Sequence, residues 1–209
     1  MPDLYTIKTI KTNIMKTQMK NAILRFPLLV ISIVLISACG RSESSPVPEK
    51  PEVPQQDLFT AVLMGDYEAV VQHIKAGTDI NQVEPDGGST PLITAIVFGK
   101  TDISRALIDA GANLEIRNNE GSTAVLVAAL FCRTETLKIL LEAGADPSVT
   151  NNYGSTALQT VEIPFESIKT VYDEISRGLG PLGLKLDYRR LEDERPVIAD
   201  ILRTHSNNQ

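Results

Sequence analysis

The sequence predicts an all-α fold, a solenoid of about four stacked helix-turn-helix repeats with short hairpin loops and an extended C-terminal capping helix. The first observation is the tripeptide Gly-Ser-Thr, which occurs at residues 88–90, 121–123 and 154–156, so that successive copies are 33 residues apart. The second is the pair of apolar helical patterns after the first two copies. One such pair buries its apolar face only by stacking on a neighbouring pair.

The N-terminal region, residues 1–38, is interpreted as a signal peptide. It carries five basic residues and one acidic residue, and an apolar run, FPLLVISIVLI, occupies residues 26–36. A basic start, a short apolar stretch and small residues before a cleavage site are typical of secretory signals. A retained anchor helix is the less favoured alternative, because this run is short for a membrane span. Met15 and Met19 also precede well-proportioned signals.

The residues Ile36-Ser37-Ala38-Cys39 resemble the lipobox of bacterial lipoproteins. The resemblance implies that Cys39 becomes the first mature residue and carries the acyl chains, palmitate among them, that anchor the protein. Gly40 follows, where an Asp commonly retains such proteins at the inner membrane. We therefore expect an outer-membrane lipoprotein that faces the periplasm of a Gram-negative bacterium. Inner-leaflet placement and surface display stay open as alternatives.

Residues 39–56 are predicted to form a disordered tether behind the lipidated cysteine. Residues 40–56 are rich in Ser, Pro, Glu and Gln and contain almost no large apolar side chain, so they cannot bury enough surface to fold. The whole chain has 20 basic and 26 acidic residues, and removal of residues 1–38 leaves 15 and 25, a net charge of −10. This balance argues against nucleic acid as a ligand and favours a basic protein partner.

Residues 57–209 are divided into repeats at 57–84, 85–117, 118–150 and 151–204. The second repeat opens with Gly-Ser-Thr-Pro-Leu at 88–92 and ends with Gly-Ala-Asn at 111–113, and the third carries Gly-Ala-Asp at 144–146. These motifs closely resemble those of ankyrin repeats. The resemblance implies an ankyrin-repeat domain whose partners are proteins.

The helix signals within each repeat support this division independently. Thr90 is placed to cap the first helix of repeat two, with Pro91 at the first helical position, where its missing N–H costs nothing. Gly99 separates the two helices, and Gly111 follows the apolar face of the second. Repeat one lacks the Gly-Ser-Thr opening but keeps both helical patterns, so it is interpreted as an N-terminal capping repeat.

The fourth repeat departs from the pattern after Leu158. The spacing of Ile168, Val171 and Ile175 predicts a helix over 164–177, the glycines over 178–183 predict a loop, and a last helix is expected over 196–203. One interpretation is an enlarged C-terminal cap. The alternative makes 162–188 an insertion, with 195–203 as the second helix of repeat four. The sequence favours neither strongly.

No constellation of residues predicts catalysis, so we expect no enzyme, no cofactor and no metal site. The two histidines, His73 and His205, are far apart in sequence, and no Cys or His cluster has metal-ligand spacing. Cys132 is expected to be a small buried or half-buried residue, although it could bridge two copies of the chain. A less favoured alternative is an enzyme with a site in 162–195 that uses four acids, Asp187, Glu192, Asp193 and Glu194.

The resemblance also implies a binding face. In ankyrin repeats the concave face combines hairpin tips with the two residues before each inter-helix turn. The tip residues here are Asp86, Asn119, Glu120, Asn152 and Tyr153, and the pre-turn residues are Leu63, Met64, Val97, Phe98, Leu130 and Phe131. All six pre-turn residues are apolar, which predicts an exposed apolar stripe for a partner. The alternative is that these side chains pack against the repeats themselves.

These observations predict a periplasmic, membrane-anchored protein–protein binding module. In architecture the chain is similar to periplasmic ankyrin immunity lipoproteins, which implies neutralisation of a secreted antibacterial effector such as a phospholipase. The alternative is a structural or envelope-stress accessory that scaffolds resident periplasmic proteins. Neither the identity of the partner nor the oligomeric state follows from the sequence.

Overall fold

The computed structural model describes residues 52–207 of the chain. The predicted signal peptide, Cys39 and most of the predicted tether lie outside the described residues and stay predictions. Within residues 52–207 the regular elements are all helices, without a strand. A search of the same residues for a helix long and apolar enough to cross a membrane found none.

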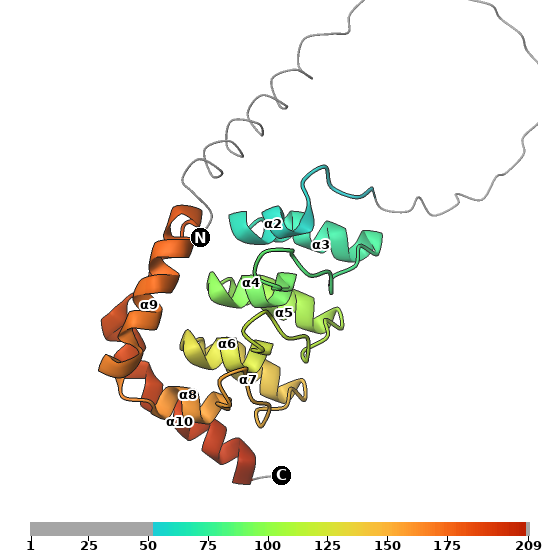
Figure 1. Cartoon of the computed structure of the whole chain (residues 1–209). Coiled ribbons are helices and arrows are strands. Elements are labelled where there is room, and N and C mark those ends of the chain that lie inside the picture. Colours follow the sequence, from blue (N-terminus) through green and yellow to red (C-terminus); the bar gives the residue numbers. More distant parts are fainter. Residues whose placement is uncertain (1–51, 208–209) are drawn as a thin grey trace, which may run out of the picture. The chain divides into compact units, whose positions relative to one another are not determined.

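The helices form a stack of pairs, which confirms the predicted fold class (Figure 1). Each pair consists of an inner and an outer helix. The pairs are α2 (Leu58–Met64) with α3 (Tyr67–Ala76), α4 (Pro91–Val97) with α5 (Thr101–Asp109), α6 (Ala124–Leu130) with α7 (Thr134–Glu142), and α8 (Ala157–Glu162) with α10 (Tyr188–Asn207). The inner helices α2, α4, α6 and α8 pack on one another in order, and so do the outer helices α3, α5, α7 and α10.

The first helix of repeat two begins where the sequence places its cap. The hydroxyl of Thr90 accepts a hydrogen bond from the N–H of Ile93 at 3.2 Å, and Pro91 is the first helical residue of α4. Asp57 caps α2 in the same way through the N–H of Thr60, at 3.0 Å. Each cap satisfies a donor that the helix itself leaves without a partner.

The core runs between the inner and outer helices. Leu107 of α5 and Leu140 of α7 are fully buried and stand 33 residues apart, so the same position of the repeat supplies the same core contact. Such stacking is the reason why one repeat cannot be stable without its neighbours.

The fourth repeat contains an insertion. Because α8 packs on α6, and α10 packs on both α8 and α7, these two helices complete the fourth pair. Between them lie α9 (Phe165–Leu179), the 3-10 helix η1 (Gly180–Leu182) and an extended return; we call residues 165–187 the arm. In Figure 1, α9 extends from the level of α8 toward the level of α2. The contacts therefore favour the insertion alternative.

Two sequence expectations about this region are wrong. The loop expected over 178–183 is largely helical, because α9 continues to Leu179 and η1 follows it. The last helix begins at Tyr188, eight residues before the Pro196 that was taken as its start. Pro196 removes one backbone hydrogen bond from α10. Two ion pairs between residues four apart, Arg189–Asp193 and Arg190–Glu194, span the turns of α10 that precede it.

Candidate functional site

The six predicted pre-turn residues lie at the carboxyl ends of the inner helices. They differ in exposure along the stack. Met64, after α2, is 75% exposed, whereas Phe131, after α6, is 3% exposed. The four that are half-buried are Leu63, Val97, Phe98 and Leu130. The apolar stripe is therefore open at the first repeat and closed at the third.

The arm and the start of α10 close the stripe at repeat three. The hydroxyl of Tyr172, on α9, donates to the carbonyl of Leu130 at 2.6 Å. Arg190 donates to the carbonyls of Cys132, at 3.1 Å, and Phe131, at 3.4 Å. These contacts satisfy carbonyls that the end of α6 leaves free. The prediction that Phe131 lies on an open stripe is corrected, because the inserted segment packs where the stripe would continue.

The base of the arm is held by aromatic packing. The rings of Phe165, Tyr172 and Tyr188 contact one another, with centroid separations of 5.9 to 6.5 Å. Tyr172 is fully buried, and burial raises the pKa of its hydroxyl to about 12. The hydroxyl therefore stays protonated and available to donate to Leu130 throughout the neutral range.

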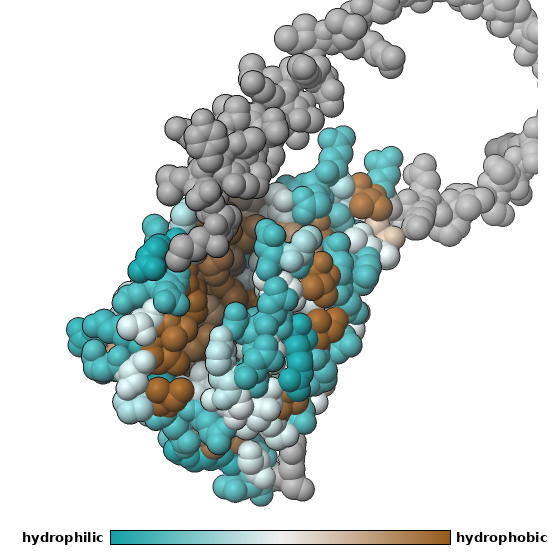
Figure 2. Space-filling view, in the orientation of Figure 1, coloured by the Kyte–Doolittle hydropathy of each residue, from teal (hydrophilic) through white to brown (hydrophobic). Residues whose placement is uncertain are grey.

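Beyond this base, the arm keeps apolar side chains without burying all of them. Ile168 is buried, Ile175 and Leu179 are partly buried, and Val171 is 42% exposed. Figure 2 shows apolar surface gathered in a hollow between the arm and the repeats. We call this hollow the groove. The accessible apolar residues of the two elements that flank it are Leu63, Met64, Val97 and Phe98 on the stack and Val171, Ile175 and Leu179 on the arm.

The predicted tip asparagines hold neighbouring repeats together. The Asn119 carboxamide donates to the carbonyl of Asp86 at 2.9 Å, and its backbone N–H donates to Gly87 at 3.0 Å. Asn152 repeats this arrangement 33 residues later, on the carbonyls of Asn119 and Glu120. We call this series the tip ladder. Because their carboxamide donors are engaged, Asn119 and Asn152 have a structural role beside any contact with a partner.

The tip ladder gives the physical reason for the repeated Gly-Ser-Thr motif. Gly88 and Gly121 adopt positive φ, and a Cβ on either would lie within 3 Å of the backbone nitrogen of the next tip asparagine. Glycine is therefore required for two reasons: the positive φ, and the close approach of the next asparagine to the position of its missing Cβ. Gly154 has the same positive φ but nothing within 4 Å of its missing Cβ.

The remaining predicted tip residues are exposed. Asp86 and Glu120 lie at the surface, and Tyr153 is 74% exposed. The hydroxyl of Tyr153 donates to a carboxylate oxygen of Glu120, and this hydrogen bond, together with the charge of Glu120, raises the pKa of Tyr153. The two side chains thus form a fixed polar pair across two repeats.

The described residues carry a strong acidic excess. They hold 13 Lys and Arg against 23 Asp and Glu, a net charge of −10. Several of the acids are exposed in the segments that link one helix pair to the next, namely Asp79, Asp86, Glu115, Glu120 and Asp146. A field of this sign attracts a basic partner and repels polyanions.

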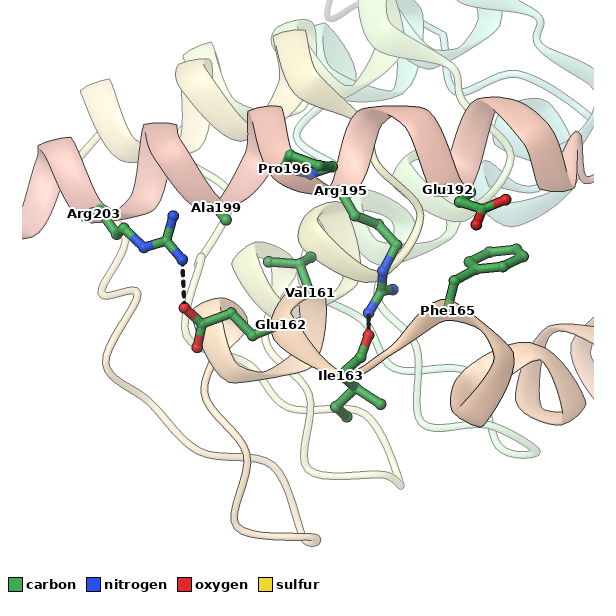
Figure 3. A pocket seen from close by; sticks show the side chains of 9 residues that line it. All are labelled: Val161, Glu162, Ile163, Phe165, Glu192, Arg195, Pro196, Ala199 and Arg203. Atoms are coloured by element: carbon green, nitrogen blue, oxygen red, sulfur yellow. Dashed lines mark hydrogen bonds and ion pairs between the residues drawn. The ribbon is translucent and has the colours of Figure 1, made fainter.

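A pocket of about 450 Å³ lies between α8 and α10. In Figure 3 its apolar wall includes Val161 and Phe165, and two of its polar side chains, Arg195 and Arg203, are paired. Arg195 donates to the carbonyl of Ile163 at 2.6 Å, and Arg203 forms an ion pair with Glu162 at 2.7 Å. These two contacts join α8 and its C-terminal end to α10 across the pocket.

Two acids of the enzyme alternative, Asp187 and Glu194, have structural hydrogen bonds. Asp187 accepts from the N–H of Arg190 at 3.1 Å and so caps α10. Glu194 accepts from the hydroxyl of Thr134 at 2.8 Å and pairs with Arg190. Within residues 52–207 there is also no group of three or more His, Cys, Asp or Glu side chains that could hold a metal ion.

Cys132 occupies the turn position at which repeats one and two have glycine. Its φ is +49°, and its side chain is buried with Sγ 3.5 Å from the carbonyl of Leu191. Burial raises the pKa of the thiol to about 11. A protonated, inaccessible thiol is poorly placed to bridge two copies of the chain.

Sequence reasoning missed Tyr172, Arg190 and Arg195 as the residues that position the arm. A signal for Arg195 existed, because Leu191, Arg195, Ile198 and Leu202 follow helical spacing, which places an arginine on the apolar face of α10. An arginine there is buried only if polar groups from elsewhere meet it. Those groups are the Tyr172 hydroxyl and two carbonyls at the end of α8.

Comparisons with known proteins give one family match. Residues 58–159 match the family model described as ankyrin repeats, in three copies. Among solved structures, the chain is similar to the one described as "Crystal structure of the ankyrin repeat domain of Bcl-3: a unique member of the IkappaB protein family", with 29% identity and a TM-score of 0.48. This match covers 49% of the present chain and 45% of that chain, which is less than half of its length. No curated protein matched the sequence.

Proposed function

Residues 58–159 are ankyrin repeats, which indicate a protein–protein interaction module, and from this premise we propose that the chain is a membrane-tethered periplasmic protein that binds a basic protein in its groove. The observation that carries the proposal is the groove itself. Its stack wall includes Met64, which is 75% exposed, and its arm wall includes Val171, which is 42% exposed. Apolar side chains left open on two facing elements are typical of an interaction site.

The acidic charge supports the choice of a basic partner. The described residues have a net charge of −10, so a protein of opposite charge is steered toward this surface. Charge sets the rate and the choice of partner, whereas burial of apolar side chains in the groove supplies most of the affinity.

The finer proposal is that the partner is a secreted antibacterial effector, such as a phospholipase, which the chain neutralises. The lipobox-like residues 36–39 and the acidic ankyrin repeats support it by their similarity in architecture to periplasmic ankyrin immunity lipoproteins. A tether at the membrane would place the binding module where an enzyme that attacks lipid must act.

This proposal is tested in two stages: the partner protein is captured, and its toxicity is then measured with and without the chain. The full chain, tagged at its C-terminus, is purified in detergent from cross-linked envelopes, and the captured protein is identified. That protein is then exported to the periplasm of a test strain with and without the chain. We expect a basic protein that stops growth alone and is harmless when the chain is present. A resident envelope protein without toxicity would contradict the immunity proposal and favour a scaffold.

A further inference from the structure

The tip ladder ends at repeat four, where the last two tip carbonyls have no asparagine among the described residues to donate to them. In repeats two and three, two consecutive tip carbonyls each accept a hydrogen bond from the next asparagine, namely those of Asp86 and Gly87 and those of Asn119 and Glu120. Thirty-three residues further on, the equivalent carbonyls belong to Asn152 and Tyr153. Within residues 52–207, no hydrogen bond reaches either of them.

The space beside these carbonyls is also open. No atom lies within 4 Å of the missing Cβ of Gly154, the position at which Gly88 and Gly121 meet the next asparagine. Asn152 and Gly154 are exposed, and the hydroxyl of Tyr153 is directed back to Glu120 on repeat three. The residue that would continue the period is Lys185, which belongs to the arm.

We propose that this open end of the tip ladder is a second docking site, which binds a loop of a partner protein through one asparagine. The asparagine would donate its backbone N–H to the carbonyl of Tyr153 and its carboxamide to the carbonyl of Asn152. Its side-chain oxygen would lie over Gly154. The site uses none of the groove residues, so it stands independently of the function proposed above.

The hydrogen bonds that Asn119 and Asn152 form in the tip ladder indicate why the occupant should be an asparagine. Each step needs two donors on one residue, separated so that they reach the carbonyls of consecutive residues, as the backbone N–H and Nδ2 of Asn119 do at 3.0 and 2.9 Å. Aspartate lacks the second donor. Two donors held at this spacing on one residue can reach both carbonyls at once.

A second copy of the chain is a poor occupant of this site. The tip that a copy stacked head to tail would present lies where repeat one meets repeat two and reads Glu84-Pro85-Asp86, without an asparagine. The asparagines Asn119 and Asn152 of a copy are engaged in its own tip ladder. The geometry therefore points to a different protein that carries an Asn-containing loop.

The test uses a peptide probe with the sequence of the chain's own donor loop, Arg-Asn-Asn-Glu-Gly, acetylated and amidated. It is titrated into the isotope-labelled full chain in detergent, and amide chemical shifts are followed by NMR. We expect shifts confined to residues 152–155. The same peptide with its second asparagine replaced by aspartate loses a hydrogen bond and gains a like charge, so it should bind about tenfold more weakly.

Two variants of the chain complete the test. Gly154→Asn fills the open space with its own side chain and should weaken binding of the peptide about tenfold. Gly77→Asn is the matched control, because Gly77 has the same φ of +76° and equally open surroundings, and asparagine tolerates this conformation. Equal affinities for both peptides, shifts outside 152–155, or equal effects of the two variants would each overturn the proposal.

Discussion

The guanidinium of Arg195 donates a hydrogen bond to the hydroxyl of Tyr172 at 3.2 Å, and Tyr172 donates in turn to the carbonyl of Leu130 at 2.6 Å. This chain of contacts joins α10, α9 and the end of α6. Arg195 is 4% exposed and forms no ion pair within residues 52–207, so carbonyls and one hydroxyl carry its hydrogen bonds. The arm, which is one wall of the groove, is positioned by these two buried side chains.

Replacement of Arg195 should destabilise the fourth repeat strongly. Arg195→Met removes the donors to the buried carbonyl of Thr160 and the part-buried carbonyl of Ile163, which costs about 3 kcal/mol of unfolding free energy. Arg189→Met is the control in the same helix, because the Arg189 side chain is 92% exposed, and it should change stability by less than about 0.5 kcal/mol. Urea unfolding measures both; similar losses would show that the buried network is not what holds the arm.

The tip ladder predicts unequal costs for two chemically identical substitutions. Gly154→Ala should cost about 1 kcal/mol, the penalty of positive φ alone. Gly121→Ala should cost about 3 kcal/mol, because its Cβ would also lie 2.8 Å from the backbone nitrogen of Asn152. Urea unfolding of the two variants side by side decides the point, and equal losses would mean that close approach adds nothing to the requirement for glycine.

The chain should lose stability in alkaline solution. The pKa of Cys132 is about 11 in the folded chain, against 9.0 for an exposed thiol, because the folded chain buries it. Below pH 9 the thiol is protonated in both states, and its contribution to the unfolding free energy is complete. As the pH rises from 9 to 11, the unfolded chain releases the thiol proton before the folded chain does, so this contribution is lost. The loss is on the order of 2 kcal/mol.

Cys132→Gly provides the control for this pH dependence. Glycine suits the φ of +49° and cannot ionise. The unfolding free energy of the parent should fall more between pH 8 and pH 10.5 than that of the variant. Tyr172, whose pKa is also raised by burial, is present in both proteins and adds to the fall in each. Identical falls in the two proteins would contradict burial of the thiol.

The lipid anchor is tested by one substitution outside the described residues. Cys39→Ser removes the sulfur that the lipobox resemblance assigns to acylation. Cell fractionation should find the parent with the membranes and labelled by a palmitate analogue, whereas the variant should be unlabelled and leave the membrane fraction. A parent that never takes up the label would contradict lipidation.

The sequence predicts what depends on neighbours in the chain or on the 33-residue period. Thr90 and Pro91 predict the start of α4 because a cap acts over three residues. Leu107 and Leu140 predict the core because the period places them alike. The contact of Arg190 with the carbonyl of Phe131 could not be predicted in this way, since 59 residues separate the two in the sequence.

The same limit explains the errors in the fourth repeat. Pro196 is a helix-start signal locally, but α10 continues through it because Leu191 and Ile198 are both fully buried on either side. The stability of that packing exceeds the cost of one lost backbone hydrogen bond. Tyr172 likewise looks like a polar break in an apolar face until its partners, Leu130 and Arg195, are placed around it.

Partner binding in the groove is the central claim, and its most direct measurement compares one captured partner across three forms of the full chain. The parent is set beside the double variant Met64→Asp with Phe98→Asp, and beside Val197→Asp, which places the same charge at an exposed apolar residue of α10 that the groove does not include. Isothermal titration gives each dissociation constant. We predict at least a hundredfold weaker binding for the double variant, since two apolar anchors are lost, and parent-like binding for Val197→Asp. Parent-like binding by the double variant would contradict the groove as the binding site.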